Sequence, residues 1–376
     1  MFTQLKNVLN ICFLVKIIVF DTLGACNFPL SFFCFLWFYC RGTRRKSISE
    51  RKSYRMRKIL LLPFTCLLLA GCTLFTSSDP NFSRELYDDY YEKEEFNEAL
   101  NYINERIEKY PEDPYLLSEK GYILLELDEF QEALKILDKA LEYEEDMGTI
   151  YNNRAVALNG LGRYEEAIDN TKKAIELEPE EPEQYANMGN ALFYLERYEE
   201  ALTYYDLALD IDPQLDFALY GKGSAHYYLN EYEESIEAFE SYLTYDPFDL
   251  DTLWYFTNIY EELEEYEKAI EYLDLLVENG EEDIFNTLDY KGYLLTIMER
   301  FDDAIEVYDN LIEHYPEEAY SYYGKGVALI NVGKIDEGLD HLTKAISFDP
   351  SIADWAYDDP FLSDVTENEK FQKLVD

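Results

Sequence analysis

The chain lacks cysteine beyond residue 72 and has few histidines. All six Cys residues lie at or before Cys72, so the acidic remainder contains no disulfide, thiolate metal site or cysteine nucleophile. His226, His314 and His341 lie far apart and match no zinc-ligand spacing. No glycine-rich phosphate loop follows a predicted strand, and no acidic loop has the calcium-binding pattern. The sequence therefore predicts neither an enzyme nor a cofactor nor a metal site, although its many carboxylate pairs leave catalysis as an alternative.

Basic residues are also scarce. The chain has 32 Lys and Arg against 78 Asp and Glu, a formal net charge of −46. Residues 1–72 carry eleven basic and two acidic residues, so the rest has 21 and 76, a net charge near −55. Such a surface repels nucleic acid, which is bound by Lys and Arg that displace counterions. The 35 Tyr and 23 Phe supply apolar surface that a disordered acidic chain would lack, so we expect a folded protein.

Residues 56–72 have the pattern of a bacterial secretory signal. Arg57 and Lys58 precede an apolar stretch that ends in small residues. Leu69–Cys72 resembles a lipoprotein lipobox, and this resemblance implies that Cys72 carries acyl chains such as palmitate and becomes the mature N-terminus. More than one chain would give a stable membrane anchor. We therefore expect a lipid-anchored protein of the bacterial cell membrane that faces the extracellular or periplasmic side. In the alternative interpretation, residues 59–70 form an ordinary buried helix.

Residues 1–55 do not fit such a signal, which must lie at the N-terminus. Met56 is the only Met between Met1 and the apolar stretch, so we interpret 1–55 as an over-extended start. The competing interpretation is a membrane-associated leader with segments at 7–20 and 24–40. Both are shorter than the roughly 20 apolar residues that a spanning helix needs. Residues 73–79 would form a short tether.

Small residues recur along the acidic region at a fixed spacing. The interval is 34 residues, with one step of 35, and the series is Ala99, Ala133, Ala167, Ala201, Ser235, Ala269, Ala304 and Gly338. Proline residues close six of the eight intervals, and proline ends a helix because it has no donor N–H. In the unit that begins at Pro182, Tyr185, Met188 and Leu192 line one face of a first helix. The small residues Gly189 and Ala201 allow a second helix to approach closely.

These positions resemble the tetratricopeptide (TPR) repeat, whose period is 34 residues. The resemblance implies an all-α, right-handed superhelical α-solenoid of eight helix-turn-helix repeats with a C-terminal capping helix at 353–376. The array spans 80–352, and its units are 80–113, 114–147, 148–181, 182–215, 216–249, 250–284, 285–318 and 319–352. In five units, Lys or Arg replaces the usual Leu at one position of the first helix. We expect the aliphatic stems of these basic side chains to lie along apolar surface, with their charges in water.

The resemblance also implies where a partner would bind. In this family the first helices line a concave face that holds extended or helical segments. The corresponding polar residues are Asn152, Asn153, Asn187, Asn190 and Asn258, whose amides could pair with a peptide backbone. The corresponding aromatic residues are Tyr220, Tyr227, Trp254, Tyr255, Tyr290, Tyr293, Tyr320 and Tyr323, of a kind that dominates binding hot spots. Alternatively, the Asn residues are polar surface and some of the rings pack between units.

Acidic residues are interleaved with these aromatic residues, among them Asp251, Glu261, Glu262 and Asp289. They favour a protein or peptide partner that is basic as well as apolar. The family's carboxylate clamp for chaperone termini lacks its lysines here. We therefore predict a scaffold or adaptor that binds a peptide or protein segment in the concave groove at the bacterial cell surface. A diffuse, acidic, cation-binding surface protein and self-association of the array remain alternatives.

Overall fold

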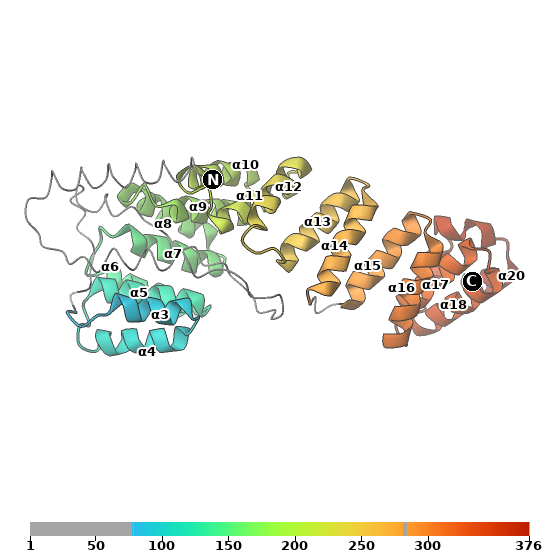
Figure 1. Ribbon diagram of the computed structural model, residues 1–376, viewed down its shortest axis with the longest axis horizontal. Helices are drawn as coiled ribbons and strands as arrows, with labels where there is room; N and C mark the ends of the chain where they lie inside the picture. Colours follow the sequence, from blue (N-terminus) through green and yellow to red (C-terminus); the bar gives the residue numbers. More distant parts are fainter. Residues whose placement is uncertain (1–76, 78, 281–283, 376) are drawn as a thin grey trace, which may run out of the picture. The chain divides into compact units, whose positions relative to one another are not determined.

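The described helices follow one another in pairs (Figure 1). The computed structural model describes residues 77, 79–280 and 284–375, and no strand occurs among them. The predicted leader at 1–55, the signal at 56–72 with Cys72, and most of the tether at 73–79 lie outside these residues. Within the described part of the chain, no helix is both long and apolar enough to cross a bilayer.

Each unit contains a first and a second helix. The first helices are α3 (Arg84–Glu92), α5 (Pro114–Glu126), α7 (Gly148–Gly160), α9 (Pro182–Tyr194), α11 (Asp216–Tyr228), α13 (Leu250–Glu262), α15 (Ile284–Ile297) and α17 (Ala319–Asn331). The second helices are α4 (Phe96–Ile107), α6 (Phe130–Leu141), α8 (Tyr164–Leu177), α10 (Tyr198–Ile211), α12 (Tyr232–Tyr242), α14 (Tyr266–Glu278), α16 (Phe301–His314) and α18 (Ile335–Phe348). The prediction of an all-α solenoid of helix-turn-helix units is confirmed.

The same turn joins the two helices in every unit. After α9, the Glu196 N–H donates to the Phe193 carbonyl at 2.9 Å and the Arg197 N–H donates to the Leu192 carbonyl at 3.0 Å. This pair of bonds is a Schellman motif, which requires one residue in the left-handed region. The residues in that conformation are Glu94, Asp128, Gly162, Glu196, Asn230, Glu264, Glu299 and Gly333. Six of them are not glycine, although the conformation costs an L-residue roughly 1–2 kcal/mol.

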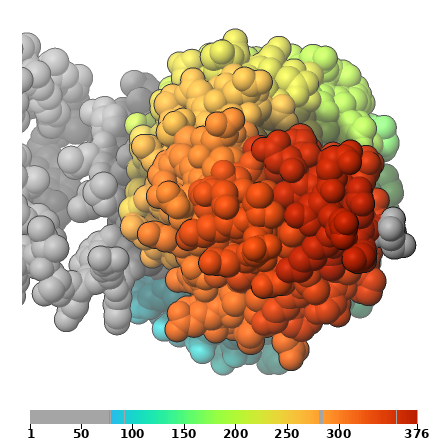
Figure 2. All heavy atoms as spheres, turned by 90° about the vertical axis from the view of Figure 1, so that its right-hand side faces the viewer, coloured from blue at the N-terminus to red at the C-terminus, as the bar shows by residue number. Residues whose placement is uncertain are grey.

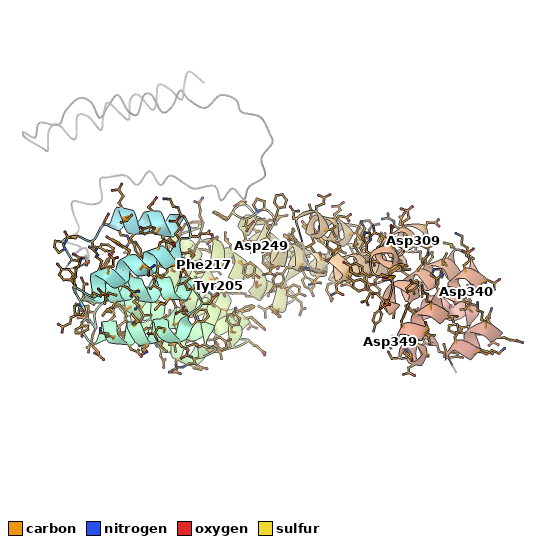
Figure 3. The ribbon with its side chains drawn as sticks, turned by 90° about the horizontal axis from the view of Figure 1, so that it is seen from below. Tyr205, Phe217, Asp249, Asp309, Asp340 and Asp349 are labelled. Atoms are coloured by element: carbon orange, nitrogen blue, oxygen red, sulfur yellow. The ribbon has the colours of Figure 1, made fainter. Side chains whose placement is uncertain are left out.

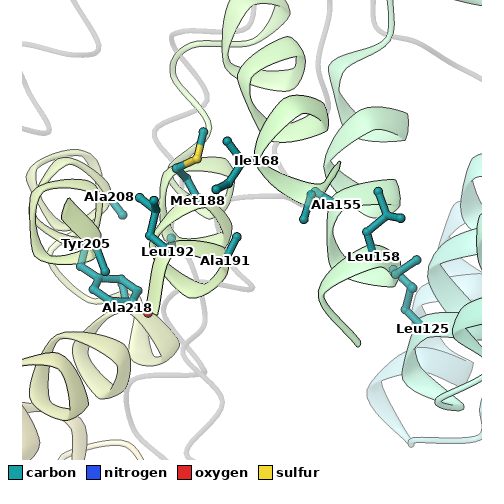
Figure 4. Packing of buried hydrophobic residues seen from close by; sticks show 14 of the residues in the cluster. Leu125, Ala155, Leu158, Ile168, Met188, Ala191, Leu192, Tyr205, Ala208 and Ala218 are labelled. Carbon is teal, nitrogen blue, oxygen red and sulfur yellow. The ribbon is translucent and has the colours of Figure 1, made fainter. Parts of the chain in front are cut away.

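Rings on second helices lie against glycines of first helices. Tyr205 of α10 is 1% exposed and lies beside Leu192 of α9 and Ala218 of α11 (Figure 4). A Cβ atom added at Gly189 of α9 would lie 2.6 Å from this ring, and one added at Gly221 of α11 would also clash with it. One ring therefore fills the space between the first helices of two successive units. Tyr308 of α16 has the same relation to glycines of α15 and α17.

Four of the five basic residues that depart from the repeat pattern form ion pairs between units. Arg154 Nη2 lies 2.7 Å from an oxygen of Asp138, and Lys222 Nζ lies 2.7 Å from Asp206 Oδ1. Two further pairs join Lys291 to Asp274 and Lys325 to Asp309, which is labelled in Figure 3. The basic side chains are largely covered, as expected of stems that lie along apolar surface. Their charges, which were expected to lie in water, instead pair with acids of the preceding second helix.

The end of the chain differs from the single polar helix expected over 353–376. It contains α19 (Ile352–Ala356), the 3-10 helix η1 (Pro360–Val365) and α20 (Glu369–Val375). Two new helix starts divide this stretch of chain. Asp359 caps the start of η1 ahead of Pro360. At the start of α20, the Asn368 side chain accepts from the Lys370 N–H at 2.9 Å. Leu362, Val365 and Phe371 are buried with residues of the last unit, so this closing segment is amphipathic. In Figure 2, which faces this end, the red closing segment and the orange last units form one continuous surface.

Candidate partner-binding face

The first helices of neighbouring units contact one another, so their remaining side chains lie on one side of the array. These contacts join α5 to α7, α7 to α9, α9 to α11, α11 to α13, and α15 to α17. We call this surface the first-helix face. The predicted partner-binding residues all belong to these first helices: Asn152 and Asn153 to α7, Asn187 and Asn190 to α9, Tyr220 and Tyr227 to α11, Trp254, Tyr255 and Asn258 to α13, Tyr290 and Tyr293 to α15, and Tyr320 and Tyr323 to α17.

Four of the five predicted asparagines are largely taken up by the array itself. Asn187 Nδ2 donates to Asn152 Oδ1 at 2.9 Å, which links α9 to α7. Asn190 Oδ1 accepts from the hydroxyl of Tyr205 at 2.7 Å. Asn153 and Asn187 are only 6% and 9% exposed. Asn152, Asn187 and Asn190 therefore link neighbouring helices, and Asn153 is buried, so much of their polar capacity serves the array.

The tyrosines of α11 and α13 form a half-buried group, the middle aromatic cluster, which consists of Tyr220, Tyr227 and Tyr255. The Tyr227 and Tyr255 ring centroids lie 4.9 Å apart, and Tyr220 lies 6.2 Å from Tyr255. Tyr255 also stacks on the buried ring of Phe239 at 4.8 Å. Burial raises the pKa of the Tyr255 hydroxyl to about 12, so it remains a hydrogen-bond donor at neutral pH. The cluster presents ring edges and hydroxyls on a rigid base.

The aromatic residues continue from α13 to α15. Trp254 stacks on Tyr290 with ring centroids 6.2 Å apart, and Tyr290 stacks on Tyr293 at 6.1 Å. The Tyr290 hydroxyl donates to a carboxylate oxygen of Glu261 on α13. The rings of Trp254 and Tyr290 therefore pack between units, which is one of the two roles expected for the predicted aromatic residues. Tyr293 and Tyr320 remain 48% exposed.

A cavity of about 510 Å³ lies between α15, α17 and the closing segment. Tyrosines predicted from the sequence line it, namely Tyr293, Tyr320 and Tyr323, together with Tyr308 of the second helix α16. Phe361 and Pro360 contribute apolar surface from η1. We call this space the C-terminal cavity. Its size falls in the range of sites that hold a small ligand or a large side chain.

Carboxylates give the C-terminal cavity its charge. Asp289 of α15 lines it, as do Asp358 and Asp359 of the closing segment. The hydroxyl of Tyr323 donates to Asp359. Burial, and to a smaller extent the nearby Glu318, raise the pKa of Asp289 to about 6. Since none of the lining residues is basic, the cavity can accept a cation from outside.

Only part of this cavity is predictable from the sequence. The positions of the three tyrosines on first helices indicate a binding surface, and Asp289 is one of the acids interleaved with them. Asp358, Asp359 and Phe361 do not follow from the sequence pattern, which predicts a single polar helix for the closing segment. The run Asp358–Pro360 was an available signal, since an acid followed by proline often begins a helix. No group of histidines, cysteines and acids in the described part of the chain is arranged to hold a metal ion.

Comparison with family models identifies the repeats. A model described as the tetratricopeptide repeat matches residues 149–181 and 182–215, and a second model of the same description matches 85–149, 220–284 and 298–352. Together they cover most of the chain. It therefore belongs to the tetratricopeptide-repeat family. Members of this family are generally non-enzymatic scaffolds, and the repeats support a role for this chain as a scaffold for protein–protein interaction.

Solved structures of other proteins resemble parts of the chain. YrrB, described as a TPR protein with an unusual peptide-binding site, is 29% identical, with a TM-score of 0.42 over 48% of this chain and 92% of YrrB. PilF of Pseudomonas aeruginosa is 20% identical, with a TM-score of 0.47 over 55% of this chain and 94% of its own. The type IV pilus biogenesis factor PilW is also 20% identical, with a TM-score of 0.48 over 53% and 92%. A comparison with curated proteins finds no match.

The pKa of Asp289 predicts a pH-dependent effect of the substitution Asp289→Asn. The folded-state pKa of about 6 lies above the unfolded value of about 3.9, so the ionised carboxylate destabilises the fold. This cost is absent below about pH 4 and complete above about pH 6. We expect Asp289→Asn to raise the free energy of unfolding by about 1–2 kcal/mol at pH 7.5, and by much less at pH 4.5. Urea denaturation at both pH values measures the difference, and an equal effect at both would contradict the assignment.

Proposed function

We propose that the first-helix face forms a concave groove that binds an extended or helical segment of a partner protein, and that this segment is both basic and apolar. The observation that carries the proposal is the run of aromatic residues from α11 to α17. These residues share one face, and Tyr293 and Tyr320 remain about half exposed on it. Aromatic side chains supply large contact area at low entropic cost, which is why they dominate binding hot spots.

Charge supports the basic character of the partner. Asp251 and Glu262 are exposed on α13 beside the middle aromatic cluster, and Asp289 lines the C-terminal cavity. The formal net charge of −46 would attract a basic segment over a distance and speed its capture, and salt would screen this attraction. The half-buried rings would supply the apolar contacts once the segment has arrived.

We further propose that Cys72 anchors the array to the outer side of a bacterial membrane through attached acyl chains. This proposal rests on the order of features in residues 56–72, where a basic start, an apolar stretch and a lipobox-like ending follow one another. A short tether after Cys72 would place the first unit close to the lipid surface. The groove would then recruit an envelope or secreted partner.

A site-specific photo-crosslinker tests the groove directly. We would place it at Asp251 on α13 and, as a matched control, at Glu237 on α12. Both residues are exposed acids, so each replacement removes one negative charge without disturbing the core. In cells that express the full chain, we expect one discrete partner from position 251 and none from position 237, because only α13 is a first helix.

Three outcomes of the crosslinking experiment would count against the groove. Equal labelling from both positions would indicate diffuse binding to an acidic surface. An adduct with the mass of two copies from position 251 would indicate self-association. Absence of labelling from both positions would contradict a groove that holds a protein segment.

The tether is tested by the substitution Cys72→Ser, with Cys66→Ser as a matched control in the same apolar stretch. If Cys72 carries the acyl chains, we expect Cys72→Ser to abolish metabolic labelling with an alkyne-bearing palmitate, because serine offers no thiol. The control should label as strongly as the wild type. Equal labelling of the wild type and Cys72→Ser would rule out the proposed anchor.

A further inference from the structure

The C-terminal cavity combines rings and acids on three separate elements. Tyr293 comes from α15, Tyr320 and Tyr323 come from α17, and Asp359 comes from the closing segment. The half-exposed rings of Tyr293 and Tyr320 leave the cavity accessible from the first-helix face. It therefore lies where a segment bound along that face could insert a side chain.

No basic residue among those that line the cavity balances its negative charge. Asp289 makes no hydrogen bond or ion pair with any described residue. The basic residues of the same two helices are engaged elsewhere, since Lys291 pairs with Asp274 and Lys325 pairs with Asp309. A partly buried carboxylate without a partner costs stability, and an incoming cation would remove that cost.

We propose that the C-terminal cavity is an anchor pocket for an arginine side chain of the bound partner segment, which deepens the groove-binding function proposed above and depends on it. The guanidinium would pair with Asp289 and stack on the exposed tyrosine rings. A planar guanidinium can accept both kinds of contact at once, because it presents donors in its plane and a flat face to an aromatic ring. The apolar stem of the side chain would lie against Phe361.

The composition of the walls favours arginine over a purely apolar side chain. An apolar occupant would exclude water from Asp289 and leave its carboxylate desolvated and unpaired, which is unfavourable. Lysine could satisfy the charge, but its compact ammonium group cannot make planar contacts with a ring and a carboxylate together. A single arginine guanidinium could stack on the tyrosine rings and pair with a carboxylate of this cavity at the same time.

The pH dependence of binding follows from the groups around Asp289. The titratable groups that line the cavity or act on Asp289 are all acids or phenols, namely Tyr293, Tyr308, Tyr320, Tyr323, Glu318, Asp358 and Asp359. Lys291 and Lys325 of the same helices pair with Asp274 and Asp309. Burial, and to a smaller extent Glu318, favour protonated Asp289 below about pH 6. Affinity for an arginine peptide should therefore rise between pH 5 and pH 7.5 as the carboxylate ionises.

The proposal is tested with two capped peptides, acetyl-Leu-Arg-Leu-amide and the same peptide with citrulline, each carrying a fluorophore. Citrulline has nearly the shape of arginine but no charge. Fluorescence anisotropy with the full-length chain in mild detergent gives both affinities. We expect the wild type to bind the arginine peptide at least tenfold more tightly than the citrulline peptide at pH 7.5, and this ratio to shrink at pH 5.

A pair of charge-matched variants assigns the preference to the cavity. Asp289→Asn should reduce the ratio below about threefold, whereas Asp210→Asn, which removes an exposed acid on α10, should leave it unchanged. Equal binding of the two peptides by the wild type, no binding of either, or an unchanged ratio in Asp289→Asn would each overturn the proposal. If the crosslinker at position 251 still captures a partner in that case, the groove function stands and only the arginine pocket fails.

Discussion

The contact between a second-helix ring and two first-helix glycines sets how closely neighbouring units pack at two junctions of the array. Tyr205 fills the space between Gly189 and Gly221, and Tyr308 fills the equivalent space between Gly292 and Gly324. A single Cβ atom at any of these glycines would clash with the ring, so the helices can approach this closely only without one. Because the ring belongs to one unit and the second glycine to the next, each contact packs neighbouring units as well as the two helices of a pair. Stability in such an array is the sum of contacts of this kind between neighbours.

The binding face follows from that packing. Since the first helices contact one another, the side chains that the core does not use lie together on one side, where tyrosines and acids alternate. Many of these side chains also serve the scaffold, as the Asn152 to Asn187 bond and the Trp254 to Tyr290 stack show. The exception is the end of the array. There the closing segment replaces a further unit, and the C-terminal cavity keeps exposed rings and an unpaired carboxylate.

The sequence predicted the repeated features well because a 34-residue period is visible in residue type. The helix pairs, the small residues at close approaches and the aromatic first-helix positions all recur. Features that depend on two distant residues escaped prediction. The pairing of Lys222 with Asp206 needed a comparison of positions 16 residues apart, and the left-handed turn residues are mostly Glu or Asp rather than glycine. The cavity walls supplied by Asp359 and Phe361 were missed because the closing segment belongs to no repeat.

The most direct test of this account is hydrogen exchange of the full-length chain carrying Tyr308→Ala, with Tyr357→Ala as a control at an exposed ring. Removing a buried aromatic ring costs about 3–5 kcal/mol, and here the loss should fall on the helices that the ring joins. The account predicts faster exchange in α15, α16 and α17, with α5 to α8 and the control unchanged. Unaltered protection in α15 and α17, or an equal loss along the whole array, would contradict the claim that these rings hold neighbouring units together.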